Sequence, residues 1–300
     1  MSRVVAVGRF DGVHRGHQHL LTEARRCAPG LPITAYTFPP RGPSLLTLDA
    51  KVSLLGNHVD EVIVVSWEQV QNMTSVAFLR DELAGRLGAA AVAVGPDHRF
   101  GRGRTGSLAT LHRLAPHLGL AIHVIEPLRL EGEVVSSRRI RDLITCGDVA
   151  KAASLLGRPA WLAGMPTPGA KLARRLGYPT VNLDPFPNLV PPRPGVYAAW
   201  AQWPRGEGKS LFYIGDRPTF PDLPSSAEIH LLAPPKGEVD GPVEVHLLKF
   251  VRPDKRFDAE GTLVQQIGRD RALAEEMLEG TPSPSRLLGE EELRSPGAGP

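Results

Sequence analysis

The chain has 300 residues, and its hydrophobic fraction of 42% is enough for a sizeable core, which at this length suggests about two domains. The formal net charge of +3 comes without a Lys-rich run, which argues against an arm that binds nucleic acid. Cys27 and Cys146 are too few for a disulfide framework, and no stretch is typical of a signal peptide or a membrane span. We therefore expect a cytoplasmic protein with reduced thiols.

The first half of the chain alternates strand-like and helix-like patterns. Short apolar runs that are typical of buried strands occupy residues 4–8, 33–38, 59–67, 90–95 and 120–127. Helical spacing is found between them, at residues 18–27, 51–58, 76–88 and 108–119. This alternation predicts a parallel sheet with helices on both faces, in which ligands bind where the strands end.

The pattern changes after residue 158, where proline and glycine become frequent. Short alternating runs at residues 195–203, 210–215, 227–233 and 243–251 predict an antiparallel barrel or sandwich. A final helix is expected from about residue 258 to residue 277. The Pro-, Gly-, Ser- and Glu-rich end is expected to be disordered. The predicted division is therefore 1–157 and 158–277, with a tail at 278–300.

The loop GRFDGVHRGHQ, residues 8–18, joins the first predicted strand to the first predicted helix. A glycine-rich turn that leads into a helix N-terminus suits anions, because the first-turn N–H groups are unpaired there and the helix dipole favours negative charge. His14 and His17 add two imidazole donors that can meet phosphate oxygens. The pattern predicts a nucleotide site that comprises Gly8, Phe10, Asp11, Gly12, His14, Gly16 and His17.

The full pattern G-x-F-D-G-x-H-x-G-H resembles the signature of the adenylyltransferase module in bacterial bifunctional riboflavin kinase/FAD synthetases. The segment GPDHRFGRGRTG, residues 95–106, is similar to that family's G-x-[DN]-F-x-F-G loop, and SSRRIRDLI, residues 136–144, is similar to its S-S-T-x-I-R motif. The resemblance implies that the two histidines contact phosphates and that Asp97 lies near the flavin. It also implies that the pyrophosphate side is held by Ser136, Ser137 and Arg141. An ordinary serine N-cap is the alternative for the serine pair.

The second half resembles the riboflavin kinase part of the same family. LGYPTVNL, residues 176–183, is similar to L-G-[FY]-P-T-A-N, in which the Thr180 and Asn182 oxygens would help hold the Mg²⁺ of ATP. IGDRPTF and AEIHLL are similar to two further elements, and the second maps the proposed base onto Glu228. Arg252 and Phe257 match an element near the flavin. Without the resemblance, Glu228 is simply a polar position on an alternating strand.

The sequence departs from the family at several points. Arg138 stands where the family has threonine, and His98 stands where it has phenylalanine. In the glycine-rich loop expected to cradle phosphates, Gly164 and Gly169 remain and Lys171 replaces part of the pattern. Fewer glycines stiffen such a loop, while a lysine adds charge. We expect Arg138 and His98 to affect efficiency rather than reaction class, and the altered glycine-rich loop motivates the monofunctional alternative below.

The resemblance implies an N-terminal Rossmann-like nucleotidyltransferase sheet and a C-terminal antiparallel riboflavin kinase barrel with a terminal helix. The implied activities are phosphorylation of riboflavin to FMN and adenylylation of FMN to FAD, each with ATP and Mg²⁺. The partners are then small molecules, with no nucleic acid and no membrane, and self-association is left open.

Three other functions remain as alternatives. One is a monofunctional enzyme with a decayed second domain, and another is a nucleotidyltransferase for a different acceptor, such as a pantetheine phosphate or nicotinamide mononucleotide. The third is a flavin or nucleotide sensor without turnover.

Overall fold

The computed structural model describes residues 2–168, 177–219 and 224–289. Its contacts divide the chain into two compact units. The first unit comprises Met1–Arg41 and Lys51–Ser136, and the second comprises Gly42–Ala50 and Ser137–Pro300. Within the described residues, none of the helices combines the length and apolar character needed to cross a membrane.

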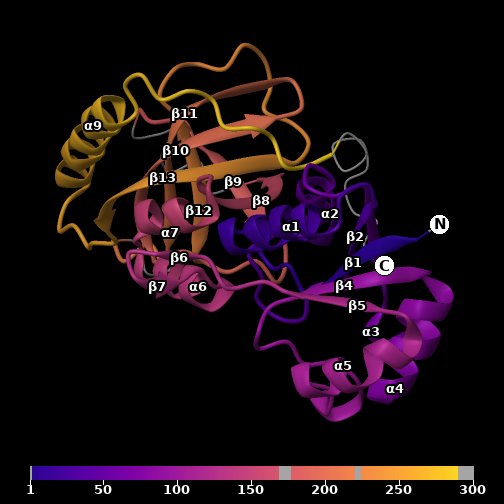
Figure 1. The fold of residues 1–300 in the computed structure, drawn as a ribbon. Helices are drawn as coiled ribbons and strands as arrows, with labels where there is room; N and C mark the ends of the chain where they lie inside the picture. The colour runs from indigo at the N-terminus through magenta and orange to yellow at the C-terminus, as the bar shows by residue number, and fades with distance from the viewer. Residues whose placement is uncertain (1, 169–176, 220–223, 290–300) are drawn as a thin grey trace. The chain divides into compact units, whose positions relative to one another are not determined.

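The first unit is built around a parallel sheet of five strands in the order β3-β2-β1-β4-β5 (Figure 1). The strands are β1 (Arg3–Val7), β2 (Ile33–Thr37), β3 (Glu61–Val64), β4 (Ala89–Val94) and β5 (Ala121–Val124). All five residues of β2 are buried, as are the apolar residues of β1, which explains the continuous apolar runs in the sequence. The predicted parallel sheet is confirmed.

Most helices of the first unit fall where helical spacing predicts them. They are α1 (Arg15–Cys27), α3 (Trp67–Val70), α4 (Ser75–Ala77), the π-helix η1 (Phe78–Arg86), the 3₁₀ turn η2 (Arg102–Arg104), α5 (Leu108–Leu114) and the 3₁₀ turn η3 (Ala115–Leu118). The single helix expected at 76–88 is therefore a short α-helix that continues as a π-helix. The helix expected at 108–119 tightens into 3₁₀ geometry at Pro116 and ends at Gly119, which is left-handed. Helix α2 (Leu48–Gly56) begins three residues before the predicted start.

A hairpin and two helices link the parallel sheet to the next part of the chain. The hairpin consists of β6 (Arg129–Leu130) and β7 (Glu133–Val134), and it is followed by α6 (Ser137–Cys146) and α7 (Val149–Leu156). Helix α7 is capped by the Asp148 side chain and ends at the left-handed Gly157. By contacts, α6 and α7 belong with the second unit, whereas the sequence analysis places residues up to 157 in the first domain.

The second unit contains a closed antiparallel barrel in the order β10-β11-β12-β9-β8-β13. Its strands are β8 (Ala160–Thr167), β9 (Val181–Pro185), β10 (Gly195–Trp203), β11 (Gly206–Gly215), β12 (Ser226–Leu231) and β13 (Val243–Pro253). Helix α9 (Glu260–Met277) packs against β10, β11 and β13, with Ala274 fully buried (Figure 1). The barrel and its terminal helix confirm the predicted fold class.

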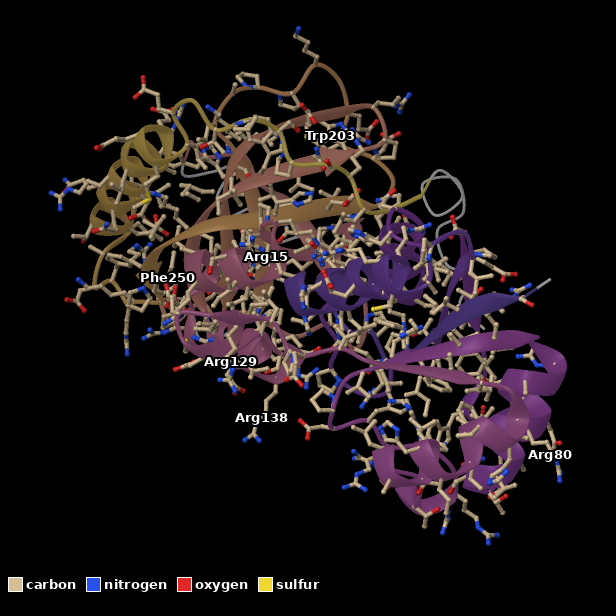
Figure 2. All side chains as sticks on the ribbon, in the orientation of Figure 1. Arg15, Arg80, Arg129, Arg138, Trp203 and Phe250 are labelled. Carbon is tan, nitrogen blue, oxygen red and sulfur yellow. The ribbon has the colours of Figure 1, made fainter. Side chains whose placement is uncertain are left out.

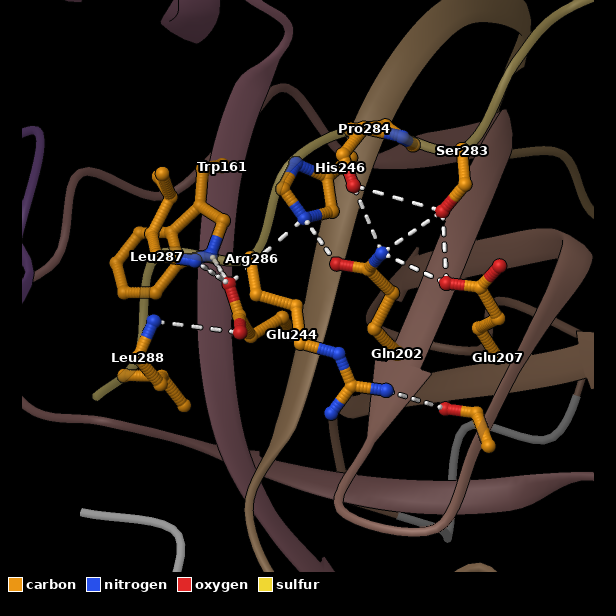
Figure 3. Close-up of polar contacts among 11 residues, drawn as sticks. Trp161, Gln202, Glu207, Glu244, His246, Ser283, Pro284, Arg286, Leu287 and Leu288 are labelled. Carbon is orange, nitrogen blue, oxygen red and sulfur yellow. Dashed lines mark hydrogen bonds and ion pairs between the residues drawn. The ribbon is translucent and has the colours of Figure 1, made fainter. Parts of the chain in front are cut away.

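Part of the segment expected to be disordered lies on the barrel. Leu287 and Leu288 are buried, and their backbone N–H groups donate to the Glu244 carboxylate at 2.8 and 3.2 Å (Figure 3). Apolar side chains and backbone donors therefore order this segment, despite its polar composition. The expected disorder does not describe these residues.

The buried carboxylate of Glu244 belongs to a larger polar cluster on the barrel. Trp161 Nε1 donates to Glu244 at 2.8 Å, and His246 Nε2 lies 3.0 Å from Gln202 Oε1 (Figure 3). Gln202 Nε2 in turn donates to Ser283 Oγ at 2.9 Å. The end of the described chain is therefore bound to three barrel strands, through Gln202 of β10, Glu207 of β11 and Glu244 of β13.

Candidate active sites

The histidine loop leaves the sheet at the carboxyl end of β1, beside the neighbouring parallel strand β4. Strand order reverses there, so it is the position where open α/β sheets bind ligands. Phe10, Gly12 and Val13 have φ angles of +49°, +82° and +41°. A positive φ is unusual for a β-branched residue, and Val13 is fully buried. The packed surroundings therefore impose this tight backbone on the loop.

His14 and His17 lie face to face at the start of α1. Their ring centroids are 3.5 Å apart and the ring planes differ by 17°. His14 is the N-cap residue, and its Nδ1 accepts the His17 backbone N–H at 3.3 Å. Because Nδ1 is an acceptor, the proton of neutral His14 sits on Nε2. The two histidines expected to act together are brought together.

The charge state of His17 is set by its surroundings. Burial lowers its pKa well below 6.5, and nearby His14 and Lys51 lower the pKa further. His17 is therefore neutral at pH 7, and within the described residues its Nδ1 has no hydrogen-bond partner. An imidazole in this state offers a neutral donor or acceptor to a ligand, and no fixed charge.

Lys51 is a buried cation beside this loop that the sequence reasoning missed. Its side chain is 3% exposed, and its ammonium donates to the carbonyl oxygens of Phe38 and Arg9, the second at 3.4 Å. Burial lowers its pKa to about 8, although nearby Asp11 acts in the opposite direction. Lys51 thus links the ends of two neighbouring strands and adds positive potential near His17.

Two glycines of the loop lie where a Cβ would be crowded. A Cβ on Gly8 would lie 3.1 Å from the Phe10 ring, and a Cβ on Gly16 would lie 3.2 Å from both the His14 ring and the carbonyl oxygen of Val135. The second contact places the start of the segment 136–144 beside the histidine loop. Ser136 follows Val135 directly, in the same unit.

Ser137 and Arg141 lie on α6, which belongs to the second unit by contacts. Their grouping with the histidine loop stays a prediction. Arg138, which replaces the family's threonine, is exposed and extends away from the α6 ribbon (Figure 2).

A cavity of about 400 Å³ lies at the same sheet edge, between the loops that follow β1 and β4. Its lining combines flat aromatic rings with cationic and acidic groups, among them Arg9, Phe38, Arg41, Trp67, Phe78, Asp97, His98 and Phe100. The Arg41 guanidinium lies 5.0 Å from the centre of the Trp67 ring, and the His98 and Phe100 rings stack at 5.7 Å. Such a lining suits a planar ring that carries an anionic group.

His98 keeps an aromatic face at the position where the family has phenylalanine. Burial, and to a lesser degree Arg104, lowers the pKa of His98 to about 4. It is therefore neutral at pH 7 and can stack as phenylalanine would. Histidine in place of phenylalanine at position 98 therefore keeps a flat aromatic ring in the wall of the cavity.

The barrel brings the predicted kinase residues together. Asn182 on β9 is directly opposite Glu228 on β12 in the antiparallel ladder. The Thr180 hydroxyl donates to Glu228 Oε2 at 3.1 Å. Two neutral oxygens and a carboxylate therefore converge at one place on the barrel.

The same carboxylate forms an ion pair with Arg217, a residue that the sequence reasoning did not single out. Arg217 Nη2 and Nε donate to Glu228 Oε1 at 2.6 and 3.1 Å, and Nη2 lies 3.4 Å from Asn182 Oδ1. Both partners are largely buried, with side chains 11% and 16% exposed. The IGDRPTF motif contained the only sequence signal for this residue.

Glu228 and Thr180 line a cavity of about 140 Å³. Apolar side chains form much of its wall, including Val196, Leu211, Phe257, Leu263 and Ile267. Arg252 donates to Asp270 at 2.8 Å, and its guanidinium lies 5.6 Å from the centre of the Phe257 ring. Arg252 and Phe257, predicted as flavin contacts, therefore lie in the same cavity as the predicted base.

Gly164 lies within β8, where a Cβ would fall 2.1 Å from the Asp184 carbonyl oxygen. Its glycine is thus required by the close approach of β8 and β9, and a role toward nucleotide stays a prediction. Gly169 and Lys171 lie outside the described residues.

A family model described as FAD synthetase matches residues 1–139, and a model described as riboflavin kinase matches residues 156–278. With the parallel sheet and the closed barrel, these matches define a transferase of the flavin-nucleotide class. The bifunctional riboflavin kinase/FMN adenylyltransferase of Escherichia coli K12 is 33% identical to this chain, and the match covers 91% of this chain and 92% of that protein. The chain belongs to the bifunctional riboflavin kinase/FMN adenylyltransferase family.

Other relatives agree with this assignment. The Pseudomonas fluorescens protein of the same description is 31% identical to this chain, and the match covers 90% of this chain and 91% of that protein. Among solved structures, a Streptococcus pneumoniae protein named for macrolide efflux matches with a TM-score of 0.81 and 26% identity, over 91% of this chain and 94% of that one. The fold of that protein agrees with the family assignment made from sequence, although its name refers to efflux.

Proposed function

We propose that the barrel phosphorylates riboflavin to FMN with ATP, and that the α/β unit adenylylates FMN to FAD with a second ATP. The observation that carries this proposal is the convergence of Thr180, Asn182 and Glu228 in a chain whose other unit presents the stacked His14 and His17. Each constellation falls within one of the two matched family models.

In the kinase reaction, the apolar cavity would hold the flavin ring with its ribityl chain toward Glu228. The Glu228 carboxylate accepts the proton of the 5′-hydroxyl as that oxygen bonds to the γ-phosphorus of ATP, and ADP leaves with the electrons of the broken bond. Arg252 and Phe257 orient the flavin. Gly164, Gly169 and Lys171 are proposed to serve the nucleotide.

The residues near Glu228 fit a magnesium ion. Mg²⁺ prefers oxygen ligands and keeps several waters, and here the Thr180 hydroxyl and the Asn182 amide oxygen stand beside a carboxylate. Thr180 and Asn182 would hold the ion with the phosphates of ATP. When bound, Mg²⁺ neutralises phosphate charge during transfer.

In the adenylyltransferase reaction, a phosphate oxygen of FMN attacks the α-phosphorus of ATP and pyrophosphate leaves. His14 and His17 donate to the phosphates, while Gly8, Phe10, Asp11, Gly12 and Gly16 shape the loop around them. The aromatic cavity that contains Asp97 and His98 is the proposed flavin position. The pyrophosphate side is assigned to Ser136, Ser137 and Arg141.

The direct test separates the flavins formed from riboflavin and from FMN, each incubated with ATP and Mg²⁺. His17→Ala should abolish FAD formation and leave FMN formation intact, and Glu228→Gln should do the reverse. Wild-type protein that forms neither product rules out both activities. Formation of FAD from FMN, without FMN from riboflavin, would support the monofunctional alternative.

The domain division at 157, the cytoplasmic location and any self-association remain predictions.

A further inference from the structure

All three nitrogens of the Arg217 guanidinium make hydrogen bonds around the proposed base. Nε and Nη2 both donate to Glu228 Oε1, Nη2 also faces Asn182 Oδ1 at 3.4 Å, and Nη1 donates to the Pro224 carbonyl oxygen at 3.1 Å. The Ser226 hydroxyl adds a third donor to Oε1 at 3.0 Å. One carboxylate oxygen therefore accepts three hydrogen bonds, while Oε2 accepts the Thr180 hydroxyl.

The backbone of Arg217 is held in an unfavourable conformation to make these contacts. Its φ angle is +50°, which is in the left-handed region that favours glycine. Its N–H donates to the Tyr213 hydroxyl at 2.9 Å, and that hydroxyl donates to Asp254 Oδ2 at 2.9 Å. Strain that the surroundings impose at a polar site is a reason to look for a function.

Arg217 also lies on the boundary between two cavities. It lines the apolar cavity with Glu228, and it lines a second cavity of about 690 Å³ that includes Asn182 and Asp216. Its side chain therefore stands between the proposed flavin side and a more open side of the barrel.

We propose that Arg217 is a positioning residue for riboflavin phosphorylation, which engages Glu228 Oε1 so that Oε2 is the oxygen that takes the substrate proton. This inference rests on the proposed kinase function. A forked guanidinium can fix the plane of a carboxylate, which a single ammonium cannot do. The proton of the 5′-hydroxyl then moves to Oε2 as the new oxygen–phosphorus bond forms.

The test compares wild type with Arg217→Gly and Arg217→Lys. Glycine suits a φ of +50° and keeps the N–H bond to Tyr213, so the variant removes the side chain without adding backbone strain. The kcat for riboflavin phosphorylation should fall about 10- to 100-fold in Arg217→Gly, as expected for loss of hydrogen bonds to a charged group, with KM for riboflavin changed less than about threefold. Arg217→Lys should lose part of this activity.

Two further readouts separate positioning from a structural role. Millimolar guanidine hydrochloride should partly restore the kcat of Arg217→Gly. FAD formation from FMN should stay at the wild-type rate in the same samples. Arg205→Ala is the matched control, since it removes an exposed ion pair with Asp240 and should leave both reactions unchanged.

Unchanged kcat in Arg217→Gly would overturn the inference while the proposed function stands. Lost kcat with no response to guanidine would also overturn it. A wild-type protein that cannot phosphorylate riboflavin would remove the proposed function, and the inference with it.

Discussion

The imidazole of His17 stacks on that of His14 at a centroid distance of 3.5 Å. One helix turn therefore carries two rings that would repel each other if both were protonated, which makes the doubly protonated state unfavourable. His14 also caps this helix through Nδ1, so its orientation is coupled to the first turn of α1. The charge of the pair is the first property that can be tested.

FAD formation should depend on a neutral His17. Because burial, His14 and Lys51 lower the pKa of His17 well below 6.5, the proton binds only at a pH well below that value. The rate of FAD formation from FMN should therefore show no protonation step at pH 6.5, and should fall only at lower pH. An acidic limb centred at or above pH 6.5 in the wild type would contradict this assignment.

Lys51 should set the alkaline limit of the same reaction. Its pKa is lowered to about 8, so the ammonium loses its charge, and with it positive potential near His17, as the pH rises through about 8. Lys51→Arg should remove this alkaline limb, because arginine stays charged, and Lys51→Met should lower FAD formation at least about tenfold at pH 7. Riboflavin phosphorylation in the same variants is the control. An alkaline limb that is the same in Lys51→Arg and wild type would assign it to another group.

His246 should make the barrel sensitive to acid. Burial, with a smaller effect of Arg158, lowers its pKa to about 3 from 6.5, so the folded barrel resists protonation more than the unfolded chain does. The stability that neutral His246 contributes is complete above pH 6.5 and is lost as the pH falls toward 3, by up to about 1.4 kcal/mol per pH unit. His246→Gln keeps a donor for Gln202, and its free energy of unfolding in urea should fall less steeply over this range than that of wild type. Equal slopes would exclude His246 as the cause.

Removal of residues 282–300 should destabilise the barrel by at least about 3 kcal/mol, because Glu244 loses two hydrogen bonds to a charged group, each worth about 1.5 kcal/mol or more. Urea unfolding followed by the fluorescence of Trp161 and the other tryptophans measures the change. Removal of residues 290–300 alone is the matched control and should leave the two bonds in place. If the two truncations have the same stability, the segment does not contribute to the barrel.

The sequence predicts the architecture well where the pattern is local. Strand β10 (Gly195–Trp203) matches the predicted run at both ends, and the parallel strands follow from their apolar character. Strands β8 and β9 gave no clear signal because proline and glycine interrupt their alternation, and their existence depends on pairing with distant strands. The ordered conformation of residues 281–288 depends in the same way on Glu244, which precedes its partner Leu287 by 43 residues.

The candidate sites likewise contain residues that local motifs indicate and residues that only the fold reveals. Thr180 and Glu228 were predicted from motifs, and the barrel brings them to 3.1 Å. Lys51 was not predicted, because a lysine in a helix has no sequence feature that distinguishes it from a solvated charge. Arg217 stands in the IGDRPTF segment, but that motif alone does not indicate which of its residues contacts the predicted base. Their roles depend on burial and on partners such as Phe38 and Asn182, which only the folded chain supplies.

The ladder that pairs Asn182 with Glu228 has a consequence for how this part of the protein tolerates change. Side chains of a strand alternate between its two faces. A one-residue deletion in β9 would therefore place the side chains of Asn182 and Glu228 on opposite faces of the barrel wall. A closed barrel can keep its hydrogen bonds after such a slip. Length variation in β9 or β12 should therefore abolish phosphorylation in proteins that still fold.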